Sequence, residues 1–121
     1  MKQEQSRQDL GQRTKDFALR IIRMYAALPK TTEAQVIGKQ VLRSGTSVGA
    51  PYREARRAKS DADFISKLEG ALQELDETIY WLELLSASGI VKAERLKPRL
   101  DECEELTAMF VTMVKNVKKR K

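Results

Sequence analysis

Residues 32–60 carry a cluster of basic side chains of a type that suits phosphate binding. Its six members are Lys39, Arg43, Arg53, Arg56, Arg57 and Lys59. Guanidinium groups can form paired hydrogen bonds with phosphate oxygens, and such contacts carry no base identity. Tyr52 is the only aromatic residue among them, so stacking on bases has little support. The cluster therefore predicts a surface that holds the backbone of RNA or DNA without reading its sequence.

Two other interpretations of this cluster are open. The six side chains could form a solvated face that pairs with acidic residues of a neighbouring helix, or they could lie in contacts between subunits. Arg20 and Arg23, nearer the N-terminus, are more ambiguous. The terminal residues 118–121, KKRK, suit a nonspecific polyanion contact or simple solubilisation.

The side chains that most enzymes and metal sites need are scarce in this chain. It has no histidine, the commonest general base and the commonest neutral metal ligand. Its single cysteine, Cys103, cannot form a Cys-His pair, a structural zinc site or an intrachain disulfide. We therefore expect no enzymatic activity, no metal and no cofactor. A lone cysteine favours a reducing compartment, and Cys103 fits best as a core residue.

Charge is distributed unevenly along the chain. There are 23 Lys and Arg against 17 Asp and Glu, and the isoelectric point near 9.6 is typical of many nucleic-acid-binding proteins. Residues 61–91 carry seven acidic groups and one basic group, whereas 1–31, 32–60 and 92–121 are each net positive by four. Internal neutralisation would thus leave a basic excess for an anionic partner.

The length of 121 residues suits one domain, spanning 1–121. No apolar run approaches the roughly 18 residues of a membrane-spanning helix, so we expect no membrane partner. The N-terminus, MKQEQSRQDLGQR, lacks the apolar segment of a secretory signal. Together with the lone cysteine, these features predict a cytoplasmic location.

Apolar residues recur at steps of three and four along nearly the whole chain. They predict helices at about 9–28, 32–59, 61–87 and 93–117, followed by a basic tail at 118–121. The third is the clearest, with Phe64, Leu68, Ala71, Leu75, Thr78, Leu82 and Leu85. Pro51 predicts a kink or break near 47–51, and Gly45 and Gly49 would let a neighbouring backbone approach closely. The expected fold is all-α, an antiparallel up-down-up-down four-helix bundle.

The apolar surface exceeds what one bundle core requires. The fourth predicted helix has a second apolar row, formed by Leu106, Met109 and Met113. Trp81, Leu84 and Leu85 form an apolar cluster on the third. Self-association as a homo-oligomer is therefore expected.

A longer motif lies in residues 43–85. Residues 43–58 read RSGTSVGAPYREARRA, and they are followed by DFISKL at 63–68, ELDET at 74–78 and YWLELL at 80–85. These stretches resemble the signature of the four-helix-bundle family of 23S rRNA intervening-sequence proteins. The similarity extends more weakly through 16–18 and 106–109. The family usually has asparagine where this chain has Pro51, so no polar role at that position carries over.

The resemblance implies an up-down bundle that assembles as a ring-like homopentamer. Family members are encoded in insertions within bacterial 23S rRNA genes or elsewhere on chromosomes. A related branch provides the accessory protein of diversity-generating retroelements, which binds a reverse transcriptase and RNA. For most members the biochemical role is unsettled.

We therefore expect a non-enzymatic oligomer that binds RNA or DNA without sequence preference through the six basic residues. It could act as a scaffold for a nucleic-acid enzyme such as a reverse transcriptase. The alternative is a protein–protein interaction module whose basic surface fits an acidic partner. Salt dependence separates the two, because phosphate neutralisation makes log K fall linearly with log salt.

Overall fold

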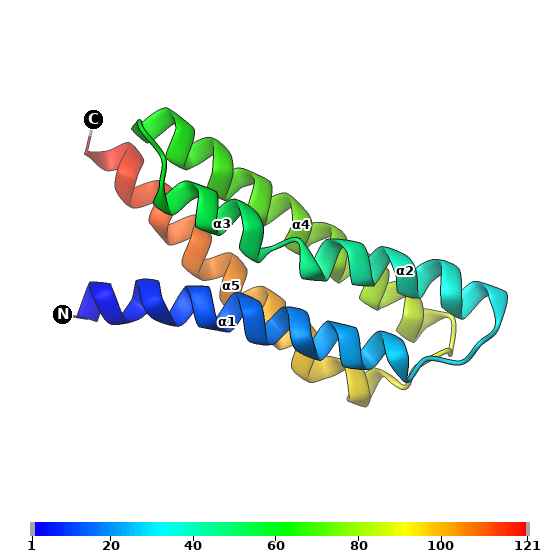
Figure 1. Ribbon diagram of the computed structural model, residues 1–121. Helices are drawn as coiled ribbons and strands as arrows, with labels where there is room; N and C mark the ends of the chain where they lie inside the picture. The colour runs from blue at the N-terminus through cyan, green and yellow to red at the C-terminus, as the bar shows by residue number, and fades with distance from the viewer. Residues whose placement is uncertain (1, 121) are drawn as a thin grey trace.

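The computed structural model describes residues 2–120, with side chains from residue 10 onward, and this part of the chain is all-helical (Figure 1). The helices are α1 (Lys2–Ala26), α2 (Thr32–Thr46), α3 (Gly49–Arg56), α4 (Asp61–Ala87) and α5 (Ala93–Lys119). Helices α2 and α3 follow one another along the bundle (Figure 1). They take the place of the single helix predicted at 32–59. The all-α fold class is confirmed, and no strand occurs within the described range.

The break between α2 and α3 lies where Pro51 predicts it. Helix α2 ends at Thr46, and Pro51 is the third residue of α3. A helical N–H in the first turn has no intrahelical partner, so the missing N–H of proline costs no hydrogen bond there. Two hydroxyls next to the break bond to the preceding turn, Thr46 Oγ1 to the carbonyl of Leu42 and Ser47 Oγ to that of Arg43, each at 2.6 Å. Such back-bonding favours a bend.

The other helix ends differ modestly from the expected ones. Helix α1 begins at Lys2 rather than near residue 9, because the polar N-terminal residues include no helix breaker. It ends at Ala26, and the turn before Pro29 is closed by bonds from the N–H groups of Ala27 and Leu28. Helix α3 ends at Arg56, three residues before the expected end, and Ser60 accepts a bond from the N–H of Asp63 to cap α4.

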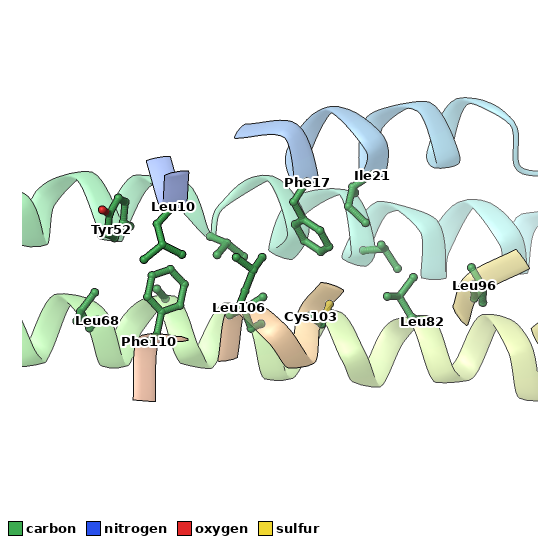
Figure 2. Packing of buried hydrophobic residues seen from close by; sticks show 14 of the residues in the cluster. Leu10, Phe17, Ile21, Tyr52, Leu68, Leu82, Leu96, Cys103, Leu106 and Phe110 are labelled. Atoms are coloured by element: carbon green, nitrogen blue, oxygen red, sulfur yellow. The ribbon is translucent and has the colours of Figure 1, made fainter. Parts of the chain in front are cut away.

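The core runs along the bundle between the helices (Figure 2). Tyr52 and Phe110 stack at one end with ring centroids 5.7 Å apart, and Leu82 and Leu96 lie toward the other. The apolar row predicted for 61–87 is buried from Leu68 to Leu85. In α5, Leu106 is fully buried, so part of the second row belongs to this core and is not spare surface. Leu85 of the expected apolar cluster is buried as well.

The helices do not pack equally. Helix α4 packs against α2, α3 and α5, while α1 packs mainly on α2 and touches α5 less. Ion pairs cross the looser seam between α1 and α5, from Arg13 to Glu105 and from Arg20 to Glu102, each at 2.8 Å. None of the described helices combines the length and apolar character needed to cross a membrane.

Candidate nucleic-acid interface

The six predicted basic residues all lie exposed on one side of the bundle, on α2, α3 and the link to α4. We call them the basic face: Lys39, Arg43, Arg53, Arg56, Arg57 and Lys59. Their outward position follows from the burial pattern of the same segment. The buried positions form one stripe that continues across the break, Val41, Ser44, Val48, Tyr52 and Ala55. At 3.6 residues per turn, the side opposite this stripe carries Lys39, Arg43, Arg53 and Arg57.

The basic face is elongated. Lys39 and Arg57 are eighteen positions apart in the sequence, which is about 27 Å at a rise of about 1.5 Å per residue. Successive base pairs of a duplex are spaced by about 3.4 Å, so this length matches roughly eight base pairs. A row of cations of this length suits a polyanion better than a single small anion.

One member of the basic face is already paired with acidic residues. Arg43 Nη2 lies 2.6 Å from Glu77 Oε1, and Arg43 Nη1 lies 3.5 Å from Glu74 Oε1. This matches the open alternative of a solvated face that pairs with the acidic helix, for this residue alone. Exposed pairs of this kind contribute little stability, about 0–1 kcal/mol.

The other five members make no ion pair with any residue in the described part of the chain. Arg56 is partly held in place, since its guanidinium lies 6.0 Å from the centroid of the Tyr52 ring. Its Nη1 also approaches α1, 3.7 Å from the position of a Cβ atom on Gly11. Arg53 and Arg57 extend from the outer side of α3, where a ligand can reach them.

Arg56 and Lys59 also border a groove of about 1140 Å³. Its walls come from α3, the start of α4 and the last turns of α5, with Phe64, Met113 and Val117 among the apolar lining. The groove gives the basic face an apolar flank. Arg120 pairs across it with Asp61 at 3.6 Å.

No chemistry for catalysis accompanies the basic face. Burial raises the pKa of the Cys103 thiol to about 12, so this side chain stays protonated in the core and is no nucleophile at neutral pH. The hydrogen bond and charge of Glu54 raise the pKa of Lys67, which keeps its amine cationic. Within the described residues, no group of three metal-ligating side chains comes together.

The sequence pattern did not reveal a second basic cluster, at the opposite end of the bundle. Arg20 and Arg23 of α1 meet the start of α5 there, where Lys92, Arg95 and Arg99 line the same cavity. The density of basic residues at 92–99 was a possible signal. Only the packing of α1 beside that segment brings the two groups together.

The chain is similar to known proteins over most of its length. A family model described as 23S rRNA-intervening sequence protein matches residues 7–112. A crystal structure from Bacteroides thetaiotaomicron, described as a protein of unknown function from the S23 ribosomal protein family, superposes with a TM-score of 0.84 at 38% identity. That match covers 90% of this chain and 97% of the other. No curated protein matches the chain.

Proposed function

Because the chain belongs to the family of 23S rRNA-intervening sequence proteins, we propose that it binds RNA or DNA without sequence preference and without enzymatic activity. The basic face carries the proposal. Five of its six cations are exposed and free of ion pairs within the described residues, and they extend over about 27 Å. Arg53 and Arg57 would each contact a phosphate through a guanidinium, while Arg56 lies to one side against Tyr52.

We further propose that the bundle is antiparallel, up-down-up-down, and assembles as a ring-like homopentamer. The family resemblance implies this assembly, and exposed apolar side chains support it: Leu19, Ile22, Val36 and Tyr80. A ring would repeat the basic face around its axis, so that weak phosphate contacts add up along one strand. Such an oligomer would suit a scaffold for a nucleic-acid enzyme such as a reverse transcriptase.

The test is the triple variant R53A/R56A/R57A, compared with wild type on two unrelated RNAs and two unrelated duplex DNAs. We expect affinity to fall alike for all four, because phosphate contacts carry no base identity. The salt slope should shrink by about 0.9 for each lost contact on duplex DNA. A charge-matched control, K15A/K97A/K115A, removes three exposed cations from other surfaces and should bind more strongly than the triple variant.

Unchanged binding by the triple variant would overturn the proposal. Loss of the oligomer in that variant would place the arginines in subunit contacts instead.

A second candidate function is a protein–protein interaction module for an acidic partner. The pairing of Arg43 with Glu74 and Glu77 favours it, since this face already accepts carboxylates. Polyglutamate that competes with nucleic acid at equal charge concentration would support this reading. Failure of polyglutamate to compete would favour phosphate.

A further inference from the structure

A cavity of about 750 Å³ lies between the end of α1, the link from α4 to α5 and the first turns of α5. Its lining is rich in cations from two helices and the link: Arg20, Arg23, Lys92, Arg95 and Arg99. Glu94 is the one acidic residue among the described lining side chains. In Figure 1 this end of the bundle, with both of these links, lies opposite the end where α3 meets α4. The cavity is thus separate from the cluster at Arg53, Arg56 and Arg57.

The charges of this cavity are not balanced by the protein. Glu102 neutralises part of them, with Oε2 2.8 Å from Arg20 Nη1 and Oε1 3.7 Å from Arg99 Nε. The side chain of Glu102 is only 11% exposed, so it holds both arginines in place. Arg23, Lys92 and Arg95 make no ion pair with any described residue. Three cations therefore face the cavity without a counter-charge.

Two further features make the site suited to oxyanions. The buried Nε of Arg99 has no hydrogen-bond partner, because 3.7 Å to Glu102 is too long for one. Helix α5 begins at Ala93 with no side chain bonded to its first N–H groups, so the positive end of the helix adds to the field of the arginines.

The size and walls of the cavity indicate more than an inorganic ion. Its volume lies within the usual range of about 300–1,000 Å³ for small-molecule sites. Met24, Leu28 and Leu96 supply apolar wall, which a base or ribose could contact. Cations concentrated at one place suit a dianionic phosphomonoester, whereas the elongated basic face suits a chain of monoanionic phosphodiesters.

We propose that this cavity binds the phosphomonoester of a nucleotide unit, held by Arg23, Lys92 and Arg95 with Arg20 and Arg99 fixed behind them. The ligand is either a free nucleotide or the phosphorylated end of a strand. This site would act independently of the basic face, so it does not depend on the proposed function.

The first experiment measures binding of AMP, adenosine and inorganic phosphate to the full chain by calorimetry. We expect AMP to bind and adenosine to bind at least about tenfold more weakly, since each charge-assisted hydrogen bond contributes about 1.5–3 kcal/mol. R23A/R95A should lose AMP binding while its helicity and thermal midpoint stay close to wild type, because both side chains are exposed. R53A/R56A/R57A should bind AMP normally, and K97A, next to the cavity on α5, is the matched control.

The second experiment distinguishes the two sources of the phosphate. Single strands with 5′-phosphate, 3′-phosphate or only hydroxyl ends are compared at equal length. A preference for one phosphorylated end that R23A/R95A abolishes assigns the site to a strand end. AMP binding without any such preference assigns it to free nucleotides.

The protonation of the ligand provides a further check. A phosphomonoester becomes a monoanion below about pH 6, and the chain has no histidine that would titrate in the same range. AMP affinity should therefore fall between pH 7.5 and pH 5.5. Equal binding of AMP and adenosine, or AMP binding that survives in R23A/R95A, would overturn the proposal.

Discussion

At the scale of single residues, small side chains decide how closely α1 and α2 approach. A Cβ atom on Gly45 would lie 2.9 Å from Ile21 Cγ1, and one on Gly38 would lie 2.5 Å from Leu28 Cδ1. Near Gly45, the buried hydroxyl of Thr78 donates to Ser44 Oγ at 2.8 Å and links α4 to α2. The glycine positions that cost helix propensity are thus required by packing.

Gly45→Ala should destabilise the protein by about 1–3 kcal/mol, because the new methyl group collides with the buried, β-branched Ile21. Gly70→Ala is the matched control. There the new Cβ would meet only Pro51 Cβ at 3.9 Å, so the gain of about 1 kcal/mol in helix propensity should appear as stabilisation. Urea unfolding monitored by circular dichroism measures both. Equal stabilisation by the two substitutions would show that α1 can move away from α2.

Cys103 should be unreactive in the folded protein. Burial raises its pKa from the ordinary 9.0 to about 12, so the folded chain holds a neutral thiol well above neutral pH. Ellman's reagent at pH 8 should label it only after unfolding in guanidinium chloride. Because the folded pKa is the higher one, the stability linked to this group is complete below pH 9 and is lost as pH rises toward 12. Fast labelling of native protein would contradict the buried position.

At the scale of the helix, Pro51 is well placed in the structure. A proline inside a continuous helix costs about 3 kcal/mol. Here the chain instead ends one helix at Thr46 and starts another at Gly49, which puts Pro51 in a first turn. The buried stripe continues in phase across this break, so Val48 and Tyr52 still reach the core.

Pro51→Asn should therefore change stability by less than about 1 kcal/mol, with a small loss the expected direction. Proline at a compatible position restricts the unfolded chain, and asparagine gives up that advantage without gaining a buried hydrogen bond. Denaturant unfolding, with Ala50→Asn as a control on the exposed neighbouring position, measures the difference. A gain approaching 3 kcal/mol would show that α2 and α3 tend toward one straight helix.

At the scale of the whole molecule, basic charge gathers at two places with different shapes. The basic face is an exposed row on α2 and α3, and the second cluster surrounds a cavity formed by α1 and α5. The acidic helix α4 neutralises only Arg43 of the basic face, through Glu74 and Glu77. The net charge of +6 is therefore available to anionic partners.

The oligomer should have a mass near five times 13.8 kDa in light scattering at micromolar concentration. Leu19 and Ile22, 39% and 45% exposed on the outer side of α1, are the first candidates for the contact. L19K/I22K should reduce the mass without loss of helicity, because neither side chain fills the core. The same double change at exposed Gln12 and Lys15, to Ala, is the control. A monomeric wild type would contradict the assembly.

Local pattern alone determined the helical class, the heptad row of α4 and the break near Pro51. Each of these depends on neighbours within one or two turns, where periodicity and the missing N–H of proline act directly. The six residues of the basic face could also be found, because they lie close together in one segment. The motif in residues 43–85 pointed to the family that the comparison with known proteins supports.

Tertiary structure decided which charges are neutralised and which remain available. The pairing of Arg43 with Glu74 and Glu77, and of Arg20 and Arg99 with Glu102, joins residues more than thirty positions apart or sets two arginines on one buried carboxylate. The burial of Leu106 and Leu85 likewise depends on which helices lie beside α4 and α5. The cavity lined by Arg23 and Arg95 exists only because the end of α1 packs against the start of α5. Coulomb interactions and burial depend on distance in space, which sequence spacing does not supply beyond one helix.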